Sequence, residues 1–156
     1  MRTALLTIIA ICIGAPGCGH EIGDSCSISS DCSSSGDRLC DIASTNGYCT
    51  IPGCDFDTCP EEATCVRFFS VGDTNIPCES NDECLAEELC TLGGFCVPRS
   101  AEVRFCMRKC GSDGDCRDNY ECRTEQLMKD HGGEPVGPPG TAIGEIEPFC
   151  AQAPPS

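Results

Sequence analysis

Apolar side chains gather in three short runs along this chain. Residues 4–15, ALLTIIAICIGA, form a nearly uninterrupted apolar stretch. Residues 64–69 and 103–108 each combine β-branched and aromatic residues with an arginine, a composition typical of β-strands. We expect the second and third runs to pair as antiparallel strands, because they share the same aromatic and arginine pattern.

The first run has the features of an export signal. Arg2 supplies a positive charge in front of it, and its length suits the core of a signal peptide while being too short to span a bilayer. It ends at Ala15, Pro16, Gly17 and Cys18, a sequence that resembles the lipobox of bacterial lipoproteins. The resemblance implies cleavage before Cys18 and a lipid on that residue. The alternative is ordinary signal cleavage at the same bond, since these residues also satisfy a small-x-small site.

A short polar segment follows the cleavage point. Residues 19–25 read GHEIGDS and are expected to form a tether that keeps the folded body close to the membrane. Gly19 is not the aspartate that, in the lipoprotein family this motif resembles, retains proteins at the inner membrane. The resemblance therefore implies an outer-membrane or cell-surface location, with the leaflet left open.

The cysteines recur in a regular pattern. Residues 78–96 contain four cysteines separated by five residues each, and residues 26–32 and 110–116 repeat the opening C-x5-C with an acidic residue before the second cysteine. An aromatic residue precedes the fourth cysteine in all three copies. Three four-cysteine repeats are therefore expected. Of the three pairings open to each unit, first to third and second to fourth is favoured, because an interlocked pair fixes a loop and hairpin with little core.

Four further cysteines lie outside the repeats. We expect Cys65 to bond Cys106 across the predicted strand pair, which leaves Cys54 and Cys59 to bond each other or to reach a neighbouring unit. The complete set expected in disulfides is Cys26, Cys32, Cys40, Cys49, Cys54, Cys59, Cys65, Cys78, Cys84, Cys90, Cys96, Cys106, Cys110, Cys116, Cys122 and Cys150.

Cysteine content also indicates how the chain is stabilised. Its 156 residues include 18 cysteines and no tryptophan, and large apolar residues are scarce beyond the first run. This composition predicts a small disulfide-rich fold, irregular and loop-rich, with short β-hairpins and little helix. Such a density of disulfides requires an oxidising compartment, which excludes the cytosol.

The number of cysteines favours the lipoprotein interpretation. Cys12 lies inside the signal and a lipid would occupy Cys18, so that sixteen cysteines remain, an even number. Ordinary cleavage would leave seventeen, with one unpaired thiol in an oxidising space. The expected segments are 1–17 signal peptide, 18–25 lipidated cysteine and tether, 26–53 first repeat, 54–77 inserted cysteine segment and connector, 78–100 second repeat, 101–109 strand, 110–150 third repeat with a long Gly/Pro loop, and 151–156 tail.

Metal ligation is the competing explanation of many cysteines, and the spacing disfavours it. Zinc sites usually contain cysteine pairs at short spacing, often with histidines nearby. In this chain no two cysteines are separated by two residues, only Cys106 and Cys110 are separated by three, and His20 is far from His131. Neither a metal nor another cofactor is expected.

No catalytic constellation is expected either. With sixteen cysteines paired, none is free to act as a nucleophile beside a histidine. His131 is expected to be solvated, and the sequence contains neither a serine nucleophile elbow nor a phosphate-binding glycine loop. We therefore expect a protein that is not an enzyme.

The chain is strongly acidic. Twenty-five acidic residues stand against nine basic ones once the signal arginine is removed, a net charge of about −16, so nucleic acid and anionic lipid surfaces are not expected partners. Asp113, Asp115 and Asp118 offer oxygen ligands for calcium, although their order differs from an EF-hand loop. The favoured interpretation is that Asp31, Asp82 and Asp115 accept backbone N–H groups in the turn before each second cysteine.

Several segments between the cysteines carry weaker signals. Residues 84–90 suit one helical turn. Residues 123–149 have no apolar periodicity and are expected to form an extended, mobile surface loop. The candidate binding surfaces are the flexible connector at residues 70–77 and the long loop at residues 129–148.

The repeat resembles the modules of Dickkopf-type amino-terminal domains, in which an acid precedes the second cysteine and a glycine-aromatic pair precedes the last. As a whole, the chain is similar to cysteine-rich bacterial lipoproteins with no assigned activity, and this similarity implies no ligand. The expected function is a membrane-anchored binding or structural module outside the cytoplasm, attached through its N-terminal lipid and recognising a protein or cell-surface ligand. The alternatives are a secreted disulfide-stapled protease inhibitor and a calcium-stabilised adhesion module.

Overall fold

The computed structural model of the chain describes residues 20–69, 76–140, 145 and 147–155. It confirms the expected fold class, since short antiparallel strand pairs and brief helices are held together by eight disulfides. In chain order the elements are α1 Ser29–Cys32, β1 Leu39–Cys40, β2 Cys49–Thr50, β3 Ala63–Phe69, η1 Asn81–Glu83, β4 Glu88–Cys90, β5 Cys96–Pro98, η2 Arg99–Ala101, β6 Glu102–Arg108, η3 Asp113–Asp115, β7 Tyr120–Arg123, α2 Glu125–His131, β8 Glu134–Pro135 and β9 Phe149–Gln152.

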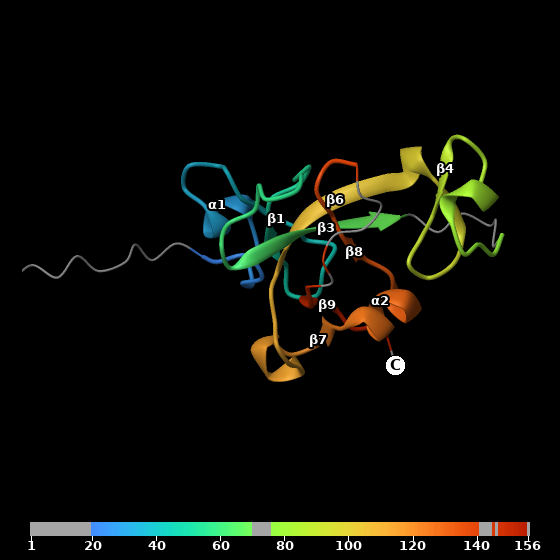
Figure 1. Cartoon of the computed structure of the whole chain (residues 1–156). Coiled ribbons are helices and arrows are strands. Elements are labelled where there is room, and N and C mark those ends of the chain that lie inside the picture. The colour runs from blue at the N-terminus through green and yellow to red at the C-terminus, as the bar shows by residue number, and fades with distance from the viewer. Residues whose placement is uncertain (1–19, 70–75, 141–144, 146, 156) are drawn as a thin grey trace, which may run out of the picture.

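A central sheet organises the fold, with strand order β6-β3-β8 (Figure 1). The expected antiparallel pairing of the two aromatic runs is confirmed, because β3 and β6 pair over seven residues, from Ala63 opposite Arg108 to Phe69 opposite Glu102. The strand pairs β1-β2, β4-β5 and β7-β9 form separate two-stranded sheets. The long central hairpin is therefore the element from which the smaller hairpins extend.

The eight bridges form four pairs. Within each repeat the first cysteine bonds the third and the second bonds the fourth, which is the connectivity favoured from the sequence. In each pair three of the sulfur atoms lie within 4.8 Å of one another. The repeat bridges are Cys26–Cys40, Cys32–Cys49, Cys78–Cys90, Cys84–Cys96, Cys110–Cys122 and Cys116–Cys150.

The four remaining cysteines form a fourth unit of the same kind. The predicted bond between Cys65 and Cys106 is wrong. Cys54 and Cys59 also do not bond each other and do not reach into a neighbouring repeat. The bridges are Cys54–Cys65 and Cys59–Cys106, again first to third and second to fourth. The two bridges thus connect the segment before the hairpin, which carries Cys54 and Cys59, to the paired strands β3 and β6.

All four units share one geometry. The third and fourth cysteines face each other across an antiparallel ladder, and each bonds back to the segment before the hairpin. These opposed pairs are Cys40 and Cys49, Cys65 and Cys106, Cys90 and Cys96, and Cys122 and Cys150. Cys65 therefore lies opposite Cys106 in the ladder but forms its disulfide with Cys54.

The residue before each second cysteine caps the preceding turn. Asp31 accepts hydrogen bonds from the N–H groups of Ser27 and Ile28, and Asp115 accepts them from Gly111 and Ser112, at 2.9 to 3.1 Å. These backbone hydrogen bonds hold the pKa of both carboxyls below its usual value.

In the second repeat the capping residue differs from the prediction. The carboxylate that accepts a backbone hydrogen bond is that of Glu83, which receives the N–H of Glu79 at 2.8 Å, so the role assigned to Asp82 is wrong. In the central unit the hydroxyl of Thr58 accepts the N–H of Asp55 at 2.8 Å. The turn requires a side-chain acceptor directly before the cysteine, and Asp82 stands one residue too early.

The second repeat is inserted into the central unit. It lies in the chain between β3 and β6, the two strands that carry the third and fourth cysteines of that unit. We call its described part, residues 76–98, the inserted lobe. In Figure 1 this lobe, which contains β4, lies at one end of the molecule, and the first unit with α1 lies at the other.

Two further expectations are corrected. The predicted extended loop between Arg123 and Phe149 contains α2 and β8, and β8 pairs with Val66 and Arg67 of the central sheet. Helix α2 buries Met128, and a helix with so short a buried face leaves no periodicity to detect. The helical turn expected at residues 84–90 is also wrong, since the short helix η1 ends before Cys84, and residues 84–90 form a non-helical turn followed by β4.

The core lies where the first, central and third units meet. It includes Ile22, Val66, Met128 and Phe149, all almost completely buried. Buried Tyr48 donates to the carbonyl of Cys150 and accepts from the N–H of Arg108, and burial raises the pKa of its hydroxyl to about 12.

An arginine and two tyrosines join the first and third units. The rings of Tyr48 and Tyr120 stack with centroids 5.4 Å apart, and the Arg117 guanidinium lies 4.1 Å from the Tyr120 centroid. Arg117 also donates to the carbonyl of Gly47. This cluster fixes two units that no disulfide connects.

Candidate functional site: a groove beside the inserted lobe

A groove of about 330 Å³ separates the inserted lobe from the body. One wall is the end of β3, with Phe68 and Phe69; another is β5 and the turn before it, with Phe95 and Val97; and α2 closes the third side. These segments are far apart in the sequence and meet where the lobe contacts the body, at the hydrogen bond from Leu92 to Glu134. The groove therefore presents aromatic surface to solvent between two rigid, disulfide-stapled parts.

A glycine brings the backbone close to the aromatic rings beneath the groove. Gly133 has a φ of +87°, and a Cβ on it would lie 2.7 Å from Phe149 and 2.8 Å from Phe68. Only glycine fits here without displacing those rings. The two rings contact each other edge to face, with centroids 6.1 Å apart. The groove wall thus rests directly on the core.

A buried ion pair connects the groove to the sheet. Arg67 donates two hydrogen bonds to Glu134, at 2.8 and 3.0 Å, and the side chain of Glu134 is 3% exposed. The other oxygen of Glu134 accepts the N–H of Leu92 in the inserted lobe. One carboxylate therefore holds both β3 and the lobe against β8.

The charged groups near the groove are engaged with one another. Lys129 lies 2.6 Å from Glu125, and His131 Nδ1 lies 2.7 Å from Glu121. His131 is exposed, as expected for a solvated side chain, and its ring also pairs with Glu121. Because these charged side chains pair with one another, a ligand in the groove would mainly contact its aromatic walls.

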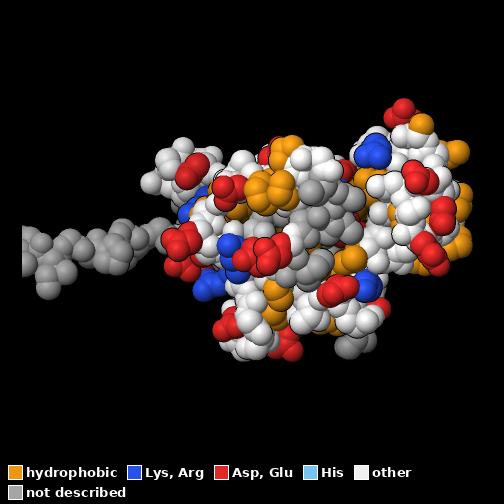
Figure 2. All heavy atoms as spheres, in the orientation of Figure 1, with side chains coloured by type: hydrophobic (Ala, Val, Ile, Leu, Met, Phe, Trp, Pro, Cys, Tyr) orange, Lys and Arg blue, Asp and Glu red, His pale blue; other side chains and the backbone are white. Residues whose placement is uncertain are grey.

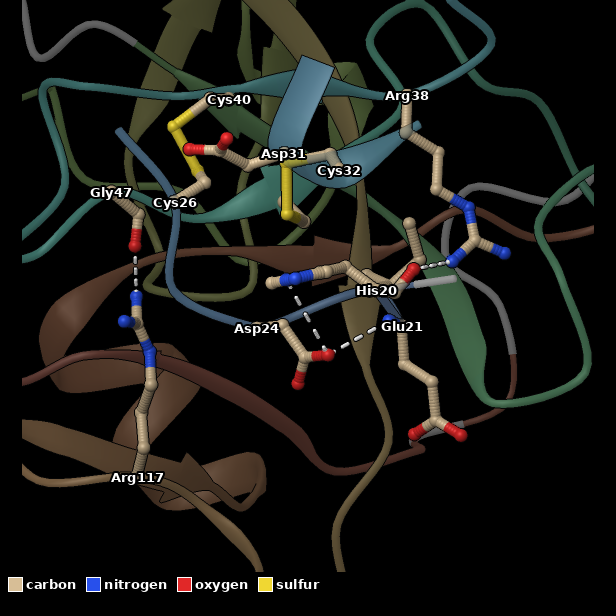
Figure 3. A network of polar contacts seen from close by, with 12 residues as sticks. His20, Glu21, Asp24, Cys26, Asp31, Cys32, Arg38, Cys40, Gly47 and Arg117 are labelled. Atoms are coloured by element: carbon tan, nitrogen blue, oxygen red, sulfur yellow. Dashed lines mark hydrogen bonds and ion pairs between the residues drawn. A yellow bond between two sulfur atoms is a disulfide. The ribbon is translucent and has the colours of Figure 1, made fainter. Parts of the chain in front are cut away.

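The segment expected to be a tether is instead docked on the body (Figure 3). Ile22 is completely buried, and the N–H of Gly23 donates to the carbonyl of Cys49 at 2.9 Å. Arg38 donates to the carbonyl of His20, and Asp24 accepts the N–H of Glu21. The segment forms a turn whose Ile22 side chain is buried in the core, which its polar composition concealed.

The sequence-based candidates fall in several places. Cys18 and most of the connector at residues 70–77 lie outside the described residues. The loop at residues 129–148 contributes its first part to the groove through the end of α2, the two glycines and Glu134.

Two of the three proposed calcium ligands accept backbone hydrogen bonds. Asp113 accepts the N–H of Cys122 at 2.8 Å, while Asp115 caps its turn. Over the described residues, the metal-binding side chains that converge in groups of three are all cysteines that take part in bridges.

The groove itself was not predicted. Its residues come from β3, the inserted lobe and α2, and a prediction would have required recognising that the second repeat is nested inside the central unit. One feature of the sequence does indicate this nesting. Phe105 directly precedes Cys106, just as an aromatic residue precedes the last cysteine of the other three units.

Comparison with protein-family models, with curated proteins and with solved structures finds no match for this chain. Within the described ranges no helix has the length and apolar character needed to cross a membrane. The function proposed below is therefore inferred from the chain's own residues.

Proposed function

We propose that this chain is an exported lipoprotein, anchored through Cys18, whose disulfide-stapled body binds a protein partner outside the cytoplasm. Eight bridges require an oxidising compartment. One observation supports the lipid anchor: the bridges use all sixteen cysteines from Cys26 to Cys150. Cys12 belongs to the signal, so Cys18 is the one cysteine of the exported chain for which these bridges offer no partner.

The docked N-terminal segment supports the same proposal. His20, only two residues after Cys18, is already fixed to the first unit by Arg38. Two residues of extended chain span about 7 Å. An acyl group on Cys18 would therefore hold the first unit at the membrane surface and leave the inserted lobe, at the opposite end in Figure 1, facing away from it.

Binding is the activity best supported by the groove. It offers aromatic side chains held by disulfides and by the Glu134 carboxylate, and a rigid apolar surface of this kind loses little conformational entropy on association. The partner is expected to insert apolar side chains between the end of β3 and β5.

Metabolic labelling with a radioactive fatty acid tests the anchor. We expect the wild-type protein and Cys12→Ala, the matched control inside the signal, to incorporate the label, and Cys18→Ala to incorporate none. Labelling of the Cys18→Ala protein, or an unlabelled wild type that begins at Cys18, would overturn the proposal in favour of ordinary secretion.

A further inference from the structure

The inserted lobe turns its large apolar side chains outward. Ile76, Leu85 and Phe95 are 48%, 71% and 43% exposed, whereas its buried aliphatic side chains are those of Leu89 and Val97. In Figure 2 hydrophobic side chains accordingly appear along the outer edge of this part of the molecule. Three large exposed apolar groups on so small a unit, one of them (Phe95) at the groove, offer a surface for a partner.

The same lobe carries charge of one sign. Between Cys78 and Pro98 there are five acidic residues and no basic residue. Several arginines of the body, in contrast, are paired with acids, as Arg38 is with Glu62 at 3.3 Å and Arg108 with Glu21 at 3.3 Å. The acidic residues of the lobe are Glu79, Asp82, Glu83, Glu87 and Glu88.

The core of the protein does not account for this exposed apolar surface. No buried residue of the lobe belongs to the main core cluster, and Leu92 packs against that cluster from the side. Two bridges hold the lobe internally, and both are confined to it. Its outward side chains are therefore available to a partner without any loss of packing in the body.

From this combination we infer that the inserted lobe and the adjoining groove dock a basic, apolar segment of a partner protein. The inference deepens the proposed function and rests on it for the orientation of the lobe away from the membrane. The apolar side chains of the segment contact Phe95, Leu85 and the groove walls, and its lysine or arginine residues face the five carboxylates. Charge complementarity selects the partner, because nucleic acid and anionic lipid are repelled by the same carboxylates.

Fluorescence anisotropy with a defined probe tests the inference. The probe is a labelled peptide of alternating lysine and phenylalanine, and its counterpart replaces every lysine by glutamate. With the full mature protein in a nonionic detergent, we expect the lysine peptide to bind, with an affinity that falls as salt is added, and the glutamate peptide not to bind. Equal binding of both peptides, or binding of neither, would overturn the inference.

Matched variants locate the binding surface. Phe95→Ser and Leu85→Ser should each weaken binding about tenfold, because each removes an apolar contact of the partner. The combined change Asp82→Asn and Glu87→Gln should weaken it about fivefold. Ile42→Ser alters a side chain that is 77% exposed on the first unit and should leave binding unchanged.

The controls separate this inference from the anchor. A mass measurement showing eight intact bridges in each variant establishes that it has folded. If Ile42→Ser weakens binding as much as Phe95→Ser, the lobe is not the site. The Cys18→Ala protein should bind the lysine peptide as the wild type does, so failure of the anchor and failure of the docking surface give separate readouts.

Discussion

Replacing Cys59 and Cys106 together by alanine is expected to unfold the body of this protein. Their bridge closes a separation of 47 residues, the longest in the chain, and joins the segment before the central hairpin to β6. On the chain-entropy model a loop of this length contributes about 4 kcal/mol. Since small domains are stable by only about 5 to 15 kcal/mol, chemical denaturation of the variant should begin with little or no denaturant.

The matched control is the double variant Cys84→Ala and Cys96→Ala. This bridge closes a separation of 12 residues that lies wholly within the inserted lobe. We expect the lobe to loosen while the fluorescence of Tyr48 and Tyr120, which report on the body, keeps its midpoint. Equal loss of body stability in the two double variants would contradict the nested arrangement of the units.

Deleting the inserted lobe is expected to leave a folded body that no longer binds the basic peptide. Phe69 and Glu102 are opposite each other at the end of the β3-β6 ladder, so a short Asn-Gly turn can join them in place of residues 70–101. The body keeps its other six bridges. The loss of Leu92, which packs against the core cluster and donates its N–H to Glu134, should cost about 1 to 3 kcal/mol.

Two measurements check the deletion. A thermal melt of the oxidised protein should still be cooperative, and reduction should add about twelve hydrogens, as expected for six bridges. Peptide binding should be lost. A deletion variant that folds and still binds would place the docking surface elsewhere, and one that fails to form six bridges would show that the lobe is required by the central unit.

The sequence determined much of the fold through cysteine spacing. Three units could be recognised because their four cysteines are close together and follow one rule. The central unit escaped recognition because the second repeat is inserted between Cys65 and Cys106 and separates its last two cysteines. The aromatic run around Cys106 did predict the strand pairing, since strand composition is a local property, whereas the choice of disulfide partner depends on where Cys54 and Cys59 fold back.

The other errors have a similar cause. Helix α2 and the N-terminal segment each bury a single large apolar side chain completely, Met128 in one and Ile22 in the other. One buried residue in a polar stretch produces no hydrophobic periodicity, so the sequence of both segments indicated solvent-exposed chain. The groove could not be predicted because its walls come from β3, the inserted lobe and α2, which meet only in the folded protein.

The intact mass of the protein extracted from its native membrane fraction, before and after reduction, tests the central claim most directly. We predict a chain that begins at Cys18, is heavier than the polypeptide by its acyl groups, and gains about sixteen hydrogens on reduction, as eight bridges require. An unmodified mass with one thiol that can be alkylated before reduction would contradict the account and identify a freely secreted protein with Cys18 exposed.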